Sequence, residues 1–433
     1  MKEIKIKDLL LSLLSFFLFL SCSEEPLVDN LENLGLSINT LSIDSISAFN
    51  YSIPPQVGSN DKLYLGNKNG LSAQKSLIKI GNTGQVNPLT GIKWYSFLDP
   101  TISLERIDSV FFRMYSHDSS YESLIDSTLI PKLFYNSNSN FSEDTSNYLN
   151  YLENFEINNW NEIILSPKIR TFEDTINKGS DNEKIIMVAE INWNLNDIIS
   201  ELIYNDTLPE NINLSRTFGI TLTNESNFIE ILSRESSSGS TDPKIQVFYR
   251  QNIILEEDGA ISDTSLLATF YASEDLSIID PSGFDSNLSD SSMICLNSGA
   301  GVQSIINIDL TSIELLNHSL IRNAILKIPL DSIRTDSEQK IIFNPLSSEP
   351  SSSDDDPYEG LGSPYRVSSE TDGGSYLQVS LKAFFQDIIY DKQINNGFKI
   401  SSSITNSPFK SVWFDFKNTN KKPIVEITYV VKL

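Results

Sequence analysis

Few side chains in this 433-residue sequence have the type and spacing that chemistry requires. The sequence holds two cysteines, Cys22 and Cys295, and two histidines, His117 and His318. Neither histidine stands at metal-ligand spacing from the other or from a cysteine. The sequence has no glycine-rich phosphate loop and no HExxH motif, and its carboxylates are scattered without a recognisable catalytic pair. The residue types therefore favour a protein that is not an enzyme, with a polysaccharide lyase or hydrolase as the less favoured alternative.

Cys22 closes a segment with the pattern of an export signal. Lysines at positions 2, 5 and 7 precede an almost purely apolar run from Leu9 to Leu20. As a helix this run would rise about 18 Å, which is too short for a hydrocarbon core about 30 Å thick. Its length is typical of the apolar part of a signal peptide, so residues 1–21 are predicted to be removed. Cys295 lies in the apolar run Met293–Leu296 and is expected to be a buried structural thiol.

The residues Phe19-Leu20-Ser21-Cys22 resemble the lipobox of bacterial lipoproteins, in which a small residue precedes the cysteine. The resemblance implies cleavage before Cys22 and acylation of its thiol and amino group by palmitate-like chains, since only a thiolate is nucleophilic enough. Two or more chains anchor a protein firmly. Ser23-Glu24-Glu25 is similar to the surface-export signal of Bacteroidetes lipoproteins. We expect a lipid-anchored protein of the cell envelope, at the outer membrane and exposed on the cell surface; the alternative is an ordinary secretory peptide.

The composition limits the possible partners. A formal net charge of −25 argues against nucleic acid and anionic lipid surfaces, because a phosphate backbone would be repelled. It is compatible with neutral glycans, with cationic partners and with calcium. Colloidal solubility of an exported protein explains the charge equally well.

The chain is long enough for two domains, and its short runs of Ile, Val, Phe and Tyr between polar turns indicate β-structure. The predicted fold is all-β with minor helix: two tandem jelly-roll-like β-sandwich domains, each with one short amphipathic helix. We predict a polar tether over residues 22–44, a first module over 45–252, a linker over 253–264 and a second module over 265–433. A solvated loop is predicted over residues 347–375.

The second half of the chain repeats the first. Residues 195–203 and 381–389 both carry apolar side chains at the i, i+3, i+4, i+7, i+8 positions of a short amphipathic helix. Both halves then close on a proline followed by an alternating strand, over 243–249 and 423–429. Repeats of this size indicate duplicated domains and not a solenoid.

These elements resemble the DNRLRE-type module, a disaggregatase-related β-sandwich of bacterial surface proteins. Ser233-Arg234-Glu235 and the strand from Pro243 to Tyr249 carry the resemblance, and the second copy keeps only the closing strand. The resemblance implies binding of polysaccharide and assigns no catalytic residue.

Exposed aromatic rings that stack on sugars are the expected mark of a glycan site. Trp94 and Tyr95, which follow a turn, are the first candidates and Trp160 is the second; core packing is the alternative for each. Asp354, Asp355 and Asp356 form an acidic run that could hold calcium, although the regular ligand spacing of calcium loops is missing. Two functions are therefore expected: a glycan-binding or adhesive surface lipoprotein, or a structural protein that binds another envelope protein.

Overall fold

The computed structural model describes residues 35–432, with gaps at 56, 87–89, 100–105, 118–123, 125–129, 138–140, 150–159, 177–178, 180–182, 205–215, 224–226, 237–240, 255–260, 285–292, 312–318, 337–339, 349–357, 359–366, 371–374, 393, 403–406 and 417–420. The predicted signal peptide, Cys22 and the aspartates Asp354, Asp355 and Asp356 lie outside the described residues, as does His318. The described chain forms antiparallel β-sheets in two modules, with the short α-helices α5 (Ile199–Tyr204) and α6 (Lys382–Ile389). The predicted all-β fold with minor helix is confirmed.

One layer of the first module has the strand order β10-β11-β7-β14-β15. These strands are β10 (Lys168–Ile176), β11 (Lys184–Asn194), β7 (Ile107–His117), β14 (Lys244–Ile254) and β15 (Ile261–Asp280). The other layer has the order β15-β4-β12-β8-β9. Its further strands are β4 (Leu71–Ile80), β12 (Arg216–Leu222), β8 (Pro131–Asn136) and β9 (Asn161–Glu162). Four short strands extend this sheet: β3 (Lys62–Lys68), β13 (Phe228–Leu232), β5 (Thr83–Val86) and β6 (Thr90–Lys93).

The second module has the corresponding two layers, β1-β24-β18-β21 and β2-β17-β22-β19-β20. The first layer consists of β1 (Leu36–Ile43), β24 (Ile424–Lys432), β18 (Leu320–Pro329) and β21 (Tyr376–Ser380). The second consists of β2 (Ile46–Ser52), β17 (Val302–Ile308), β22 (Phe398–Ser402), β19 (Lys340–Pro345) and β20 (Val367–Glu370). A separate pair, β16 (Met293–Leu296) and β23 (Val412–Asp415), matches β3 and β13.

The same hydrogen bond fixes the start of the helical segment in both modules. Leu195 N–H donates to the Val110 carbonyl on β7, and Leu381 N–H donates to the Ala324 carbonyl on β18, each at 2.9 Å. The closing strands β14 and β24 pair with β7 and β18 in matching register, so that Val247 lies opposite Val110 and Ile427 lies opposite Ala324. The internal duplication read from the sequence is therefore present in the strand pairing.

The two modules exchange one strand. In the first module β15 crosses between the layers, because residues 261–271 pair with β14 and residues 272–280 pair with β4. In the second module β1 and β2 take this role, since β1 pairs with β24 and β2 with β17. Yet β1 and β2 precede the body of the first module in sequence, and β15 precedes the body of the second. The strands that precede the first body, β1 and β2, thus complete the second module, and the strand that precedes the second body, β15, completes the first.

This pairing differs from the predicted domain limits. Residues 36–43, assigned to the tether, form β1, and residues 46–52, assigned to the first module, belong to the second. The predicted border at 253–264 lies at the β14–β15 hairpin, so residues 265–280 belong to the first module. An alternating strand shows the same apolar pattern whichever body it pairs with, so the local sequence does not reveal its partner.

In the first module a buried polar contact holds the crossing strand. Ser277 Oγ on β15 accepts the Tyr64 N–H from β3 at 2.7 Å and lies 3.0 Å from Ser76 Oγ on β4. Ser76 Oγ in turn donates to the Tyr64 carbonyl at 3.0 Å. All three residues are buried, so each polar group depends on these partners.

The second module repeats this contact with an asparagine. Asn50 Oδ1 on β2 accepts the Cys295 N–H from β16 at 3.0 Å and lies 2.7 Å from Ser304 Oγ on β17. Asn50 Nδ2 also donates to the Met293 carbonyl at 3.0 Å. Cys295 is fully buried, as expected, and burial raises the pKa of its thiol above the ordinary value. The crossing strands of the two modules therefore occupy equivalent positions.

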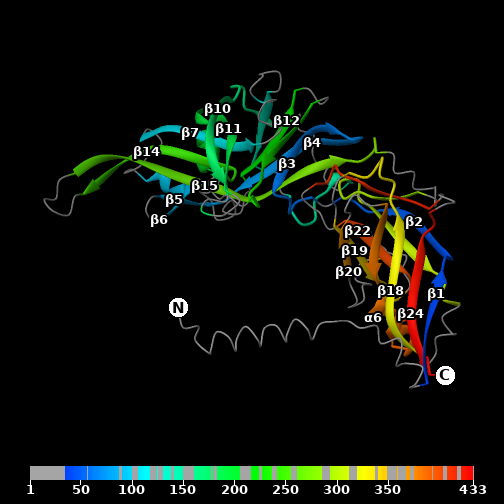
Figure 1. Cartoon of the computed structure of the whole chain (residues 1–433). Helices are drawn as coiled ribbons and strands as arrows, with labels where there is room; N and C mark the ends of the chain where they lie inside the picture. Colours follow the sequence, from blue (N-terminus) through cyan, green and yellow to red (C-terminus); the bar gives the residue numbers. More distant parts are fainter. Residues whose placement is uncertain are drawn as a thin grey trace, which may run out of the picture.

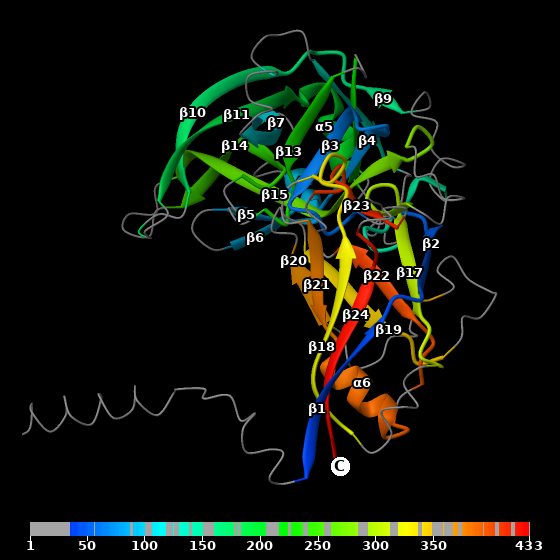
Figure 2. The ribbon, with the colours of Figure 1, turned by 45° about the vertical axis from the view of Figure 1, so that its right-hand side comes forward.

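The two helices bury apolar side chains against the sandwiches, as the sequence predicts. Leu202 and Ile203 of α5 are fully buried in the first core. In α6 the most buried side chains are Phe384 and Phe385, whereas Ile388 is only partly buried. Figure 2 shows α6 at the end of the second module remote from the first module.

We predict that Asn50→Ala loosens the second module, although residue 50 precedes the first module in sequence. The substitution leaves the Cys295 N–H and Ser304 Oγ without their acceptor, at a cost of about 1–3 kcal/mol. The rate at which a thiol reagent modifies Cys295 should rise, because that thiol is buried beside Asn50. Ser277→Ala should instead lower the stability of the first module and change the Cys295 rate less, and exposed Ser47→Ala should change neither. Faster modification with Ser277→Ala than with Asn50→Ala would contradict the strand exchange.

We predict that each helix is stabilised mainly by its buried face. Leu202→Ala should lower the free energy of unfolding by about 2–5 kcal/mol and Phe385→Ala by about 3–5 kcal/mol, as measured by urea denaturation. Exposed Glu201→Ala serves as the control and should cost under about 0.5 kcal/mol. Equal costs for Leu202→Ala and Glu201→Ala would show that this face is not the one that packs.

Candidate functional site

The predicted glycan-stacking role of Trp94 is wrong, because its ring is fully buried. The 3-10 helix η2 (Trp94–Leu98) turns the ring inward, where it stacks on Phe270 at 3.9 Å between centroids. The indole N–H donates to the Gly81 carbonyl at 3.1 Å, and the Arg216 guanidinium lies over the ring at 4.9 Å. Trp94 therefore belongs to the core.

The other two predicted aromatic residues do not form a site with Trp94. Tyr95 is 48% exposed, but its packed neighbour Trp94 faces the opposite way, into the core. Trp160 is 7% exposed and packs in a separate cluster with Phe134 and Phe141. No aromatic platform is built from Trp94, Tyr95 and Trp160.

Aromatic side chains from both modules meet at the junction between them. Phe409 of the second module contacts Tyr64 and Phe228 of the first, with ring centroids 5.2 and 4.7 Å away. Asn69 Nδ2 adds a hydrogen bond of 2.9 Å to the Phe409 carbonyl. Cys295 lies in the same buried cluster. The two modules thus share a small core of their own.

A cleft of about 560 Å³ opens beside this shared core. Residues of both modules line it: Asn69, Gly70, Gly283, Phe284, Arg334, Asp336, Ser411 and Trp413. Gly70, at φ +80°, lets two backbone segments, those of Gly70 and Gly283, approach closely. A Cβ at residue 70 would lie 2.5 Å from the Gly283 carbonyl oxygen. Neither module alone provides the whole lining.

The cleft combines flat apolar surfaces with hydrogen-bonding groups. Phe284 is partly exposed and presents the apolar face of the cleft. Trp413 is mostly buried behind it, at 8% exposure, with its ring centroid 6.5 Å from that of Phe284 and 5.4 Å from the Arg334 guanidinium. Asp336 Oδ2 accepts the Ser411 N–H at 2.7 Å. The cleft thus brings together aromatic rings, the Arg334 guanidinium, the Asp336 carboxylate and the Asn69 amide. Such a lining suits an uncharged ligand that is rich in hydroxyl groups. No pattern in the sequence marks Arg334 and Asp336, because the short polar turn that holds them carries no functional motif.

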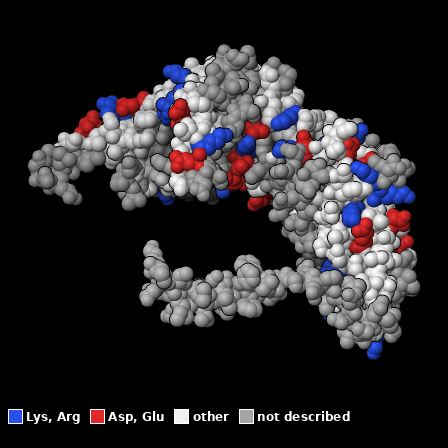
Figure 3. All heavy atoms as spheres, viewed as in Figure 1, with Lys and Arg blue, Asp and Glu red and all other residues white. Residues whose placement is uncertain are grey.

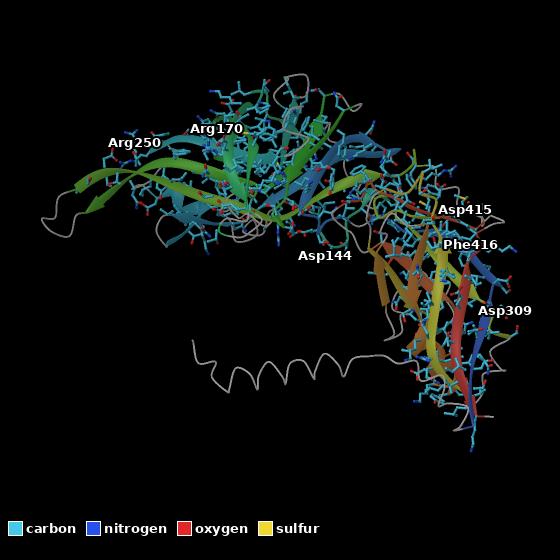
Figure 4. The ribbon with its side chains drawn as sticks, viewed as in Figure 1. Asp144, Arg170, Arg250, Asp309, Asp415 and Phe416 are labelled. Atoms are coloured by element: carbon cyan, nitrogen blue, oxygen red, sulfur yellow. The ribbon has the colours of Figure 1, made fainter. Side chains whose placement is uncertain are left out.

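A second hollow, of about 490 Å³, lies on the first module and is acidic. Its lining consists of Lys79, Phe141, Ser142, Glu143, Asp144, Arg234 and Glu274. Figure 4 marks Asp144 on the concave side of the molecule, and Figure 3 shows acidic side chains gathered there beside basic ones. Arg234 Nε pairs with Glu235 at 2.6 Å and Lys79 Nζ pairs with Glu274 at 2.8 Å.

Asp275, on the crossing strand β15, lies beneath this hollow and is fully buried. Its Oδ2 accepts the Arg234 N–H at 2.8 Å, so it ties the predicted Ser-Arg-Glu segment to β15. Burial raises the pKa of Asp275 well above its ordinary value, and the nearby carboxylates of Glu235 and Glu143 raise it further. Burial also raises the pKa of Glu143. The Ser233-Arg234-Glu235 segment, which carries the resemblance in sequence, thus makes a structural contact to the crossing strand β15.

Two findings concern the described residues as a whole. Among them, no group of three or more His, Cys, Asp or Glu side chains is arranged to hold a metal ion. No helix in the described part of the chain is long and apolar enough to cross a membrane.

Comparisons with known proteins assign no relative. The chain matches no protein family, and no curated protein matches it. Among solved structures, the Faustovirus major capsid protein aligns over 91% of this chain and 89% of its own, at 8% identity with a TM-score of 0.07. A TM-score this low supports no argument about fold or function.

We predict that Asp275→Asn stabilises the first module more at neutral pH than at pH near 4. A carboxyl with a raised pKa keeps its proton in the folded protein after the unfolded chain has lost it, so stability falls as pH rises from the unfolded pKa, about 3.9, through the folded one. Asparagine cannot titrate and keeps an oxygen that accepts the Arg234 N–H. Urea midpoints measured at both pH values test this, with exposed Asp144→Asn as the control. A gain that is the same at both pH values would contradict it.

Proposed function

We propose that this chain is a lipid-anchored protein of the cell envelope that binds polysaccharide without cleaving it, at the cleft between its two β-sandwich modules. The observation that carries the proposal is the lining of the cleft, in which Trp413, Phe284, Arg334 and Asp336 place apolar and hydrogen-bonding groups together. Sugars present both a C–H face and hydroxyl groups, and this lining can meet both. The strongly acidic chain favours a neutral glycan over an acidic one.

The environment of the carboxylates supports a binding role over a catalytic one. Glu274 and Glu235 are each paired with a basic side chain, and Asp275 lies below the surface, where a substrate would not reach it. The signal-peptide pattern and Cys22 support the lipid anchor, which would hold the protein at the outer membrane and on the cell surface.

A structural protein that binds another envelope protein is the second candidate. Ile185 and Met187 on β11 are 64% and 39% exposed, although they lie within a regular sheet. Exposed apolar side chains on a sheet are typical of a surface that contacts a protein.

We predict that Arg334→Ala weakens glycan binding about tenfold or more, since a hydrogen bond to a charged group contributes about 1.5–3 kcal/mol. The mature protein without lipid is first screened on an array of neutral and acidic glycans, and the affinity for the best ligand is then measured by calorimetry. Arg334 is 55% exposed, so the thermal transition should not change.

Arg322→Ala is the matched control, because it removes an exposed arginine from β18 of the same module. It should leave glycan affinity unchanged. A glycan that binds equally well to both variants would move the site away from the cleft. No glycan binding, together with capture of one envelope protein that Met187→Ser abolishes, would favour the second candidate.

A further inference from the structure

We propose that the free end of the second module rests on the membrane surface through the exposed side chains of Leu320, Tyr390 and Ile394. This inference depends on the proposed lipid anchor and adds to it a second contact between the protein and the bilayer. The partner is the neutral headgroup region of a phospholipid membrane.

The strand exchange determines which end of the molecule faces the membrane. Strand β1 begins at Leu36, which pairs with Lys432 near the end of the chain. This end of the second module lies far from the first module in both views (Figures 1 and 2). Residues 23–35, between Cys22 and β1, span at most about 45 Å when fully extended. A lipid on Cys22 therefore keeps this end of the second module close to the bilayer.

Without the exchange the chain would enter the first module directly, and that module would lie nearest the membrane. Instead, β1 and β2 run the length of the second module before the chain reaches the first, a distance of roughly 50 Å. The module that comes first in the sequence is thus held farthest from the membrane. The junction cleft stands away from the bilayer, where a glycan can reach it.

Large apolar side chains are exposed at the end that faces the membrane. Leu320 is 58% exposed, Tyr390 is 50% exposed and Ile394 is 69% exposed. The end of α6 lies against the start of β18, because Gln386 Oε1 accepts the Ile321 N–H at 2.7 Å. Tyr390 follows one turn later, and its N–H donates to the Gln386 carbonyl at 3.2 Å. Leu320 and Tyr390 therefore belong to the same end of the module, and Ile394 follows Tyr390 by four residues in the connection from α6 to β22.

The charges around these side chains nearly balance, in contrast to the acidic chain as a whole. Lys392 Nζ lies 5.5 Å from the Tyr390 ring centroid and 4.0 Å from Asp387. Lys432 and Asp391 add one charge of each sign. Tyrosine and aliphatic side chains enter the headgroup region of bilayers, and lysine stems can extend from it toward water. The contact is therefore apolar, and we expect it on neutral membranes.

The test couples Cys22 to a maleimide phospholipid in vesicles of phosphatidylcholine, with and without brominated acyl chains. Cys295 is fully buried and should not react. Tyr390→Trp provides a fluorescent reporter at the proposed contact, and Tyr95→Trp provides one at a similarly exposed tyrosine of the first module. Brominated lipid should quench the added fluorescence of Tyr390→Trp and leave that of Tyr95→Trp unchanged. Adding Leu320→Ser and Ile394→Ser to Tyr390→Trp should relieve the quenching.

Quenching of Tyr390→Trp no greater than that of Tyr95→Trp would overturn the membrane contact. Because the coupling supplies the lipid chemically, this failure would leave natural acylation untouched. Acylation is tested separately in cells: wild type should partition into detergent and Cys22→Ser should not. Equal partitioning of the two would overturn the lipid anchor itself, whatever the vesicles show.

Discussion

The fold depends on one segment in each module that pairs with both layers of a sandwich: the single strand β15 in the first module, and the consecutive strands β1 and β2 in the second. Such a strand crosses a buried region, so its polar groups need partners inside the protein. Ser277 and Asn50 meet this need in the same way, by accepting a backbone N–H from the short strand pair and contacting a serine hydroxyl on the neighbouring strand. The two contacts fix the register of β15 and β2 against their sheets, since a shift by one residue would bury the wrong face of the strand.

Because the crossing strands are exchanged, the two modules behave as one unit. In sequence order, β1 and β2 belong to the first repeat but complete the second module, and β15 belongs to the second repeat but completes the first. The chain therefore passes between the two modules twice, after β2 and after β15. These two passages hold the modules side by side, where Phe409 meets Tyr64 and Phe228. The passage after β15 also supplies Gly283 and Phe284 to the lining of the cleft. The candidate binding site is thus a consequence of the exchange, and a single module would not contain it.

The sequence predicts elements whose signal is local. The helices at Leu195–Ile203 and Leu381–Ile389 and the strands after Pro243 and Pro423 have clear periodicities, and the structure has them in equivalent places. The partner of a crossing strand is a long-range choice that leaves no local mark. Trp94 was misassigned because a ring after a turn can face either way, and burial against Phe270 decided it. The cleft could not be predicted, since Trp413 and Phe284 meet only after the modules are joined.

The equivalent crossing strands also show where the two copies differ in chemistry. Asp275 of β15 lies opposite Ile78, and Ala48 of β2 lies opposite the corresponding Ile306. The second module therefore has a methyl group where the first buries a carboxyl that binds the Arg234 N–H. A buried carboxyl lowers stability at neutral pH unless its surroundings compensate, whereas alanine needs no partner. The first module carries this cost together with an acidic hollow, and under the proposed anchor it is the module held away from the membrane. The second copy, whose crossing strand continues from the lipid anchor, has the plain apolar core that a supporting module needs.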